Sequence, residues 1–264
     1  MLLYIYMQTI TYLSDCFNKG KLSRWADNIM PLKVYIGKFN WYKAKGNVND
    51  EYKYTQMIID GFNLWETLSN GLVSFERTMN LYESNINIDW KRVDRKSLGS
   101  CTFNFDKLGR YYSAELSIGL SDGIIHHQYM DENEVFHTIL HEIGHSIGLG
   151  HSKTKGDIMY VPHEYGIVNI SKNDLATLKW LYKMPVGKTE AEILVQHSKY
   201  QARNVDELVL KMSGKKSDFE QIKDELMKPK QQEKDLLKEN ENIGDLKKYL
   251  MEINNLNFNF KKNK

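Results

Sequence analysis

Hydrophobic residues along the first third of the chain change from an alternating to a helical pattern. The segment PLKVYIGK (residues 31–38) alternates around Val34 and Ile36, which predicts a strand that starts at Leu32, just after the proline. Residues 51–70 carry apolar side chains at helical spacing and predict an amphipathic helix that Gly71 closes. The apolar stripe of this helix consists of Tyr54, Ile58, Phe62, Trp65 and Leu68.

Short β-rich segments follow this helix. Residues 72–77, 86–93, 100–105 and 114–120 are rich in β-branched and aromatic residues, and Gly109 stands in the turn before the last of them. Together with the strand at Leu32, they predict a sheet of about five strands.

A strong helical pattern returns in MDENEVFHTILHEIGH. Asp131 followed by Glu134 has the spacing of a capping box, and Gly148 is the predicted end of this helix. Its apolar face consists of Val135, Phe136, Ile139, Leu140, Ile143 and Ile147. A third helix is predicted to open at Ser171 with Asp174 and to close before Pro185 and Gly187.

The last part of the chain has a different composition. Residues 188–264 are rich in Lys, Glu, Gln and Asn and carry only small apolar stripes, such as Phe219, Ile222 and Leu226. This pattern predicts a solvated helical extension; a docking or oligomerisation module is the alternative.

Composition excludes several classes of protein. A chain of 264 residues allows one sizeable domain with an appendage, and its net charge of +2 is too small for nucleic acid or an anionic membrane as main partner. No segment approaches the roughly 18 consecutive apolar residues of a membrane span. The two cysteines, Cys16 and Cys101, form neither a disulfide framework nor a zinc ribbon. The N-terminus has no positive region or cleavage site typical of a signal peptide, so it predicts an early strand or a short pro-segment.

Candidate chemistry is concentrated in HEIGHSIGLGH, residues 141–151. Four helical residues turn about 400° and rise about 6 Å, so His141 and His145 lie one above the other. Two imidazoles in this arrangement can bind one metal ion at about 2.0–2.1 Å each. Glu142 projects beside the metal, where a carboxylate can take a proton from water whose pKa the ion lowers to about 7.

A catalytic zinc needs a third protein ligand and keeps one position open. His151 would lie too far along the axis if the helix continued. Gly148 can adopt a positive φ and reverse the chain, and Gly150 is expected to loosen the same turn. The sequence therefore predicts His151 as the third ligand.

A histidine-rich helix end in the core is the alternative reading of HExxH alone. The longer spacing HExxHxxGxxH is known from catalytic zinc motifs and favours the metal site. Met159 stands eight residues after His151, where a methionine below the imidazoles would give the metal a soft apolar floor. Considered by itself, Met159 would be an ordinary core methionine.

These motifs resemble those of the metzincins and, within them, the matrixins. The likeness rests on HEIGHSIGLGHS, on Ser152 directly after the third histidine and on the Met159–Tyr160 pair, and it extends over about residues 24–184. It implies that His141, His145 and His151 bind one catalytic Zn²⁺, that Glu142 is the general base and that Met159 is the Met-turn residue. The implied fold is α+β, with a mixed, twisted five-stranded sheet, two long helices and a small C-terminal subdomain that holds the Met-turn and a third helix.

The resemblance also implies how a substrate would bind. A peptide would add antiparallel to an edge strand, for which residues 100–105 are the candidate. Residues 160–165 would wall the pocket for the side chain after the scissile bond, although MYVPHEY has one residue more before its proline than the common form.

Two features typical of matrixins are missing from the sequence. The interval DRKSLG, residues 94–99, is too short for the loop that carries structural zinc and calcium, so we expect those sites to be absent. There is also no PRCGxPD-type cysteine switch. Cys16 or the adjacent Asp15 could act in latency, but each is more simply an incidental residue.

The other histidines have structural interpretations. His137 lies one turn before His141 on the same face, where packing is more plausible than a fourth ligand. His126 and His127 fall in a loop, either as surface residues or as a metal-binding pair with Asp122. His163 and His197 give no signal.

The sequence thus predicts a zinc-dependent endopeptidase acting on protein or peptide substrates. The predicted parts are an N-terminal segment (1–23), a catalytic domain (24–187) and a charged helical extension (188–264). A non-catalytic zinc-binding module whose tail recruits a partner is the alternative. The resemblance favours an extracellular or secreted location, and the oligomeric state is not predicted.

Overall fold

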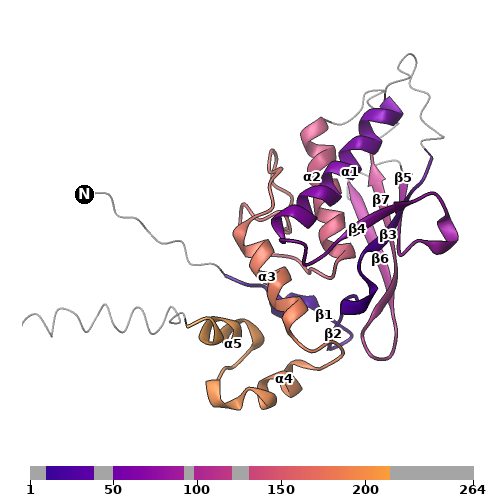
Figure 1. Cartoon of the computed structure of the whole chain (residues 1–264). Coiled ribbons are helices and arrows are strands. Elements are labelled where there is room, and N and C mark those ends of the chain that lie inside the picture. Colours follow the sequence, from indigo (N-terminus) through magenta and orange to yellow (C-terminus); the bar gives the residue numbers. More distant parts are fainter. Residues whose placement is uncertain (1–9, 39–49, 92–97, 121–130, 215–264) are drawn as a thin grey trace, which may run out of the picture. The chain divides into compact units, whose positions relative to one another are not determined.

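A mixed five-stranded sheet organises the computed structural model, which describes residues 10–38, 50–91, 98–120 and 131–214 (Figure 1). Its strands are β3 (Leu32–Ile36), β4 (Phe75–Thr78), β5 (Ile86–Lys91), β6 (Gly99–Phe105) and β7 (Tyr111–Gly119). In the order β4-β3-β5-β7-β6, the first four strands pair in parallel, and β6 pairs antiparallel with β7. The predicted α+β class is confirmed, and β6 lies at an edge, as expected for residues 100–105.

Two long helices lie side by side against this sheet (Figure 1). They are α1 (Asp50–Leu68) and α2 (Glu132–Ser146), close to the predicted ranges. The helices approach closely at Gly61, where an added Cβ would lie 2.9 Å from Ile139 Cγ2. The apolar stripe of α1 faces the core, where the side chains of Tyr54, Ile58, Phe62 and Trp65 are buried.

Both ends of α2 have defined caps. Asp131 is the N-cap and accepts a hydrogen bond from Asn133 N at 2.9 Å. The predicted capping box is wrong, because Glu134 instead pairs with His163 and accepts from Gly166 N at 3.4 Å. At the other end, Gly148 has a φ of +104° and its N–H bonds to His145 O, which with Leu149 N bonded to Gly144 O makes a Schellman motif. The predicted end of the helix at Gly148 is therefore confirmed.

The third predicted helix is α3 (Lys172–Lys183). It begins with the expected capping box, in which Ser171 Oγ accepts from Asp174 N and Asp174 Oδ2 accepts from Ser171 N. Two shorter helices follow: α4 (Glu190–Gln196) and α5 (Val205–Met212). The remaining elements are 3₁₀ turns at Leu13–Cys16, Asp27–Ile29, Leu81–Glu83 and Ser198–Tyr200, and a small hairpin of β1 (Phe17–Asn18) and β2 (Lys21–Leu22).

The chain near its N-terminus packs against helices from the C-terminal part of the same unit. Asp206 at the start of α5 accepts four hydrogen bonds, from Thr11 Oγ1, Leu13 N, Ser14 N and Ser14 Oγ. The Tyr12 hydroxyl donates to Asp174 Oδ1 of α3 at 2.6 Å. The compact unit that contains these contacts ends at residue 213. The predicted domain boundaries stay a prediction.

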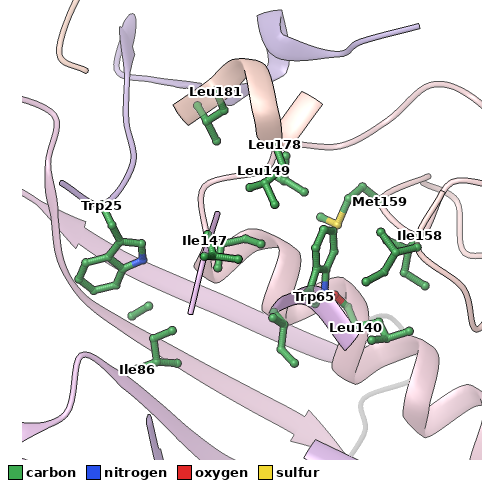
Figure 2. Close-up of a cluster of buried hydrophobic side chains, with 14 of the residues drawn as sticks. Trp25, Trp65, Ile86, Leu140, Ile147, Leu149, Ile158, Met159, Leu178 and Leu181 are labelled. Carbon is green, nitrogen blue, oxygen red and sulfur yellow. Dashed lines mark hydrogen bonds between the residues drawn. The ribbon is translucent and has the colours of Figure 1, made fainter. Parts of the chain in front are cut away.

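The buried indoles of Trp25 and Trp65 donate hydrogen bonds to backbone carbonyls of α2. Trp65 Nε1 donates to Leu140 O at 3.0 Å, and Trp25 Nε1 donates to Ser146 O at 2.7 Å. Figure 2 shows both rings within the buried cluster, with the Met159 side chain beside the Trp65 ring. Because both indoles are fully buried and hydrogen bonded, they position the helix that carries HEIGH.

Several predictions concern residues that the structure does not describe. These are the apolar stripes at Phe219, Ile222 and Leu226, the loop with Asp122, His126 and His127, and most of the interval at residues 94–99. Among the helices that the structure does describe, none combines the length and the apolar character needed to cross a membrane.

Candidate metal centre

Three imidazoles converge at the C-terminal end of α2. His141 and His145 come from the helix, and His151 comes from the chain after the Gly148 turn. The Nε2 atom of His145 lies 3.0 Å from that of His141 and 3.1 Å from that of His151. Three nitrogens at tetrahedral positions around zinc would lie about 3.3 Å apart, given bonds of about 2.0–2.1 Å. The donor set and its spacing therefore fit zinc.

Backbone carbonyls orient two of these rings. His141 Nδ1 lies 2.8 Å from Ile158 O, and His145 Nδ1 lies 2.9 Å from Leu149 O. A carbonyl oxygen only accepts, so Nδ1 carries the proton in both rings and the Nε2 lone pair is free for a metal. The turn after α2 thus supplies an orienting carbonyl as well as the third histidine.

Burial keeps the cluster in the form that binds metal. Desolvation lowers the pKa of His141 to about 3 and that of His145 to about 4, and it also lowers the pKa of His151. All three rings are therefore neutral near pH 7, which is the state in which imidazole ligates a metal.

The two glycines of the turn have different roles. Gly148 adopts the positive φ that the sequence predicted. Gly150 does not, and the expectation that it loosens the turn stays a prediction. An added Cβ at Gly150 would collide with the Asp15 carbonyl, and Gly150 N donates to Cys16 Sγ at 3.4 Å. Gly150 is needed because the segment Leu13–Cys16 crosses directly over this turn.

Glu142 is a buried carboxyl beside the three histidines. Its side chain is 6% exposed, and no group in the described part of the chain hydrogen bonds to its buried Oε2. Burial raises the pKa of Glu142 to about 7, and the positive charge of Lys91 opposes this shift. An unpaired buried carboxylate oxygen is costly, so it calls for an explanation.

The loop from His151 to Met159 is held from below by α3. Ser152 N donates to Met159 O at 2.8 Å, and Ile158 N donates to the buried Asp174 Oδ2 at 2.9 Å. The Met159 side chain is fully buried against Trp65 and next to Gly144 (Figure 2). Asp174 therefore orients Ile158, whose carbonyl orients His141.

Comparison with known families agrees with this geometry. The model of the Peptidase M10 family, described as matrixin, matches residues 38–183, which is more than half of the chain. The chain belongs to the matrixin family. Family membership makes it a zinc metalloprotease in general terms, and the mixed α+β fold is consistent with that assignment. A search of curated proteins gives no match.

The matrixin site opens into a cavity of about 540 Å³. It extends from the three histidines along α2 to His137 and is closed on one side by residues 160–163. On the other side lies the start of β6, where Gly99 approaches Glu142 so closely that an added Cβ would lie 2.6 Å from its Oε1. The edge strand and the predicted pocket wall thus flank the metal centre.

Sequence reasoning missed Gly99, which lines this cavity, and Glu134, which binds the cavity residue His163 from behind. His137 lies outside the three-histidine group, is buried in α2 and bonds through Nδ1 to Ile167 O at 2.6 Å, which fits the predicted packing role. Glu134 and His137 precede His141 at helical spacing, so they continue the polar stripe of α2 toward its N-terminus. That spacing was the available signal for Glu134. The position of Gly99 beside Glu142 depends on tertiary structure.

Neither candidate latency residue joins the histidine cluster of this matrixin. Cys16 is buried, and desolvation raises the pKa of its thiol to about 12, which disfavours the thiolate that zinc binds. The Asp15 carboxylate lies 3.5 Å from Lys153 Nζ. In this structure both residues belong to the segment that covers the Gly150 turn.

Proposed function

We propose that the protein is a zinc-dependent endopeptidase in which His141, His145 and His151 hold the ion and Glu142 is the general base. The observation that carries this proposal is the buried, unpaired carboxylate oxygen of Glu142 next to three converging imidazole nitrogens. A module that only bound zinc would have no need of that carboxylate. Met159, buried beneath the loop that follows His151, is proposed as the Met-turn residue.

Zinc, when bound, supplies a Lewis acid that polarises the scissile carbonyl and acidifies water. Glu142 takes a proton from the attacking water and then delivers it to the nitrogen of the leaving amine. Burial of Glu142 favours its protonated form between these two transfers. The carbonyls of Ile158 and Leu149 keep the histidine rings in place throughout.

The substrate would lie along β6. An edge strand leaves one row of backbone donors and acceptors without a neighbouring strand, and an extended peptide can pair with it antiparallel. Because Gly99 of β6 lies against Glu142, a peptide bound there would carry its scissile bond past the general base. Residues 160–163 would then face the side chain that follows the scissile bond.

Zinc content and cleavage of an unstructured protein such as casein test the proposal. We expect Glu142→Ala to bind zinc as the parent does and to lose about 10²–10⁴-fold in rate. The matched control is Glu132→Ala, which removes an exposed carboxylate from the same helix and should keep full activity. A parent protein that binds zinc but cleaves nothing would favour the non-catalytic zinc-binding module, and a parent that takes up no zinc would contradict both functions.

A further inference from the structure

The cavity beside the metal centre ends in a polar cluster that the proposed reaction does not use. His137 lies one turn from His141 on α2, and the His163 ring packs edge-on against it with centroids 4.0 Å apart. Behind His163, Glu134 binds Nε2 of that ring with one carboxylate oxygen and accepts from Gly166 N with the other. Both histidines line the cavity.

Hydrogen bonding fixes which atoms of this cluster can meet a ligand. His137 Nδ1 donates to Ile167 O at 2.6 Å, so the other ring nitrogen, Nε2, is an acceptor in the neutral ring. The His137 ring is only 3% exposed, and burial favours its neutral form. His163 uses Nε2 for the Glu134 carboxylate, which leaves Nδ1 for a ligand.

The charge of the cluster disfavours acidic ligands. Glu134 and His163 together carry a net charge of −1 or 0, depending on whether the imidazole is protonated. Of the residues that line the cavity, none is Lys or Arg. The residues that line the cavity therefore offer ring nitrogens at one end and no Lys or Arg that could bind a carboxylate, and the Glu134–His163 pair carries no net positive charge.

The walls between this cluster and the metal centre are largely apolar. Leu98, Val161 and Pro162 line the cavity together with Tyr160. Such a pocket fits a side chain that has an aliphatic stem and a hydrogen-bond donor at its tip.

We propose that this pocket selects Gln, Lys or Arg as the residue after the scissile bond, with His137 and His163 as its specificity-determining residues and Glu134, which binds His163 from behind, as a positioning residue. The proposal rests on the proposed endopeptidase function and names the substrate class of that site. Aliphatic side chains would leave the ring nitrogens unpaired, and acidic side chains would find no Lys or Arg among the lining residues.

Peptides that differ only in the residue after the scissile bond test this proposal. We compare Gln, Lys, Arg, Leu and Glu at that position and measure kcat/KM with the zinc-loaded full chain. One or two hydrogen bonds of about 1 kcal/mol each predict a preference of about tenfold for Gln, Lys and Arg over Leu. Binding of the same peptides to Glu142→Ala provides a readout that does not depend on cleavage and should follow the same order.

Substitutions at Glu134 and His163 test whether these residues cause the preference for Gln, Lys and Arg. Glu134→Gln keeps the shape of the side chain and removes its charge, so it should weaken Lys and Arg peptides severalfold relative to Gln. His163→Leu should abolish the advantage of all three over Leu. Tyr82→Ala, at an exposed position that does not line the cavity, is the control and should leave the order unchanged. Thermal midpoints and zinc content show whether each variant is folded. If His163→Leu does not fold, the peptide preference of Glu134→Gln still tests the proposal.

The outcomes separate this proposal from the function on which it rests. Cleavage and binding that both favour Leu, or that favour Glu, would overturn the pocket assignment and leave the endopeptidase intact. An unchanged order in Glu134→Gln and His163→Leu would equally overturn it. Absence of cleavage for every peptide and for casein would overturn the proposed function and this assignment with it.

Discussion

At the scale of single residues, two glycines show how closely the site is packed. Gly144, within HEIGH, lies next to the Met159 sulfur, and Gly99 of β6 lies against Glu142 and Thr138. Neither glycine needs a positive φ. Each is required because another side chain occupies the space of a Cβ atom, so substitution of either one tests a specific contact.

Gly144→Ala is expected to destabilise the protein. An added methyl group collides with the buried Met159 side chain, at about 1–3 kcal/mol for overpacking, against a gain of up to about 1 kcal/mol in helix propensity. Urea unfolding of Gly144→Ala, Met159→Ala and the double variant measures the coupling. The double variant should lose less than the sum of the two single losses, and strict additivity would show that the two residues do not touch.

Gly99→Ala is expected to impair catalysis more than folding. The new Cβ displaces the Glu142 carboxyl, and a misplacement of about 1 Å can cost about 10²-fold in rate. Turnover should fall while zinc content and the thermal midpoint stay close to the parent values. Thr102→Ala is the control, since it removes an exposed side chain from the same strand. Full activity in Gly99→Ala would show that Glu142 tolerates this displacement.

At the scale of elements, α5 holds the segment that covers the zinc-binding turn. Asp206 accepts hydrogen bonds from three residues of this segment, Thr11, Leu13 and Ser14. That segment in turn lies against Gly150 and buries Leu13 and Cys16. The N-terminal segment and α5 therefore act together on the chain that carries His151.

Asp206→Ala is expected to lower the free energy of unfolding by about 2–3 kcal/mol, because two backbone N–H groups and two hydroxyls lose a charged acceptor. It should also weaken zinc binding, since the cover over the Gly150 turn is loosened. Chemical unfolding and zinc titration measure both effects. Asp60→Ala, which breaks an exposed hydrogen bond to Gln56 on α1, should change neither quantity by more than about 0.5 kcal/mol. Equal effects of the two variants would argue against the role of Asp206.

At the scale of the whole molecule, the site lies in a compact unit that ends at residue 213. Helices α4 and α5 bury Ile193, Val205 and Leu208 completely, so they have the packing of core elements. The predicted boundary at residue 187 and the end of this unit at residue 213 give different expectations for shortened chains.

A chain that ends at Ser213 is expected to keep the zinc content, peptidase activity and thermal midpoint of the full chain. A chain that ends at Lys188 loses three buried aliphatic side chains, each worth about 1.5–3 kcal/mol, together with the Asp206 contacts. Its stability should therefore fall by about 5 kcal/mol or more. Equal thermal midpoints for the two shortened chains would instead support the boundary at residue 187.

Much of the fold was predictable because its signals are local. The stripe of α1, the Ser171–Asp174 capping box and the Gly148 turn are each encoded within a few residues. Boundaries were less accurate: β4 begins at Phe75 and not at Leu72, because Val73 is buried in the connection from α1 before pairing with β3 begins. Hydrophobicity alone does not distinguish a buried connection from a strand.

The sequence by itself determined the helix that carries His141 and His145, the reversal at Gly148 and the three-histidine set, because helical periodicity and glycine geometry act over short distances. Only the tertiary structure decided that Glu134 binds His163 and does not cap its own helix. It also decided that the Asp15 carbonyl occupies the space beside Gly150 and that Gly99 lies against Glu142. Each of these contacts joins segments that are remote in the chain. For Glu134, a distant partner also competes with the local cap for the same side chain. Their outcome depends on which groups the packed core brings within reach.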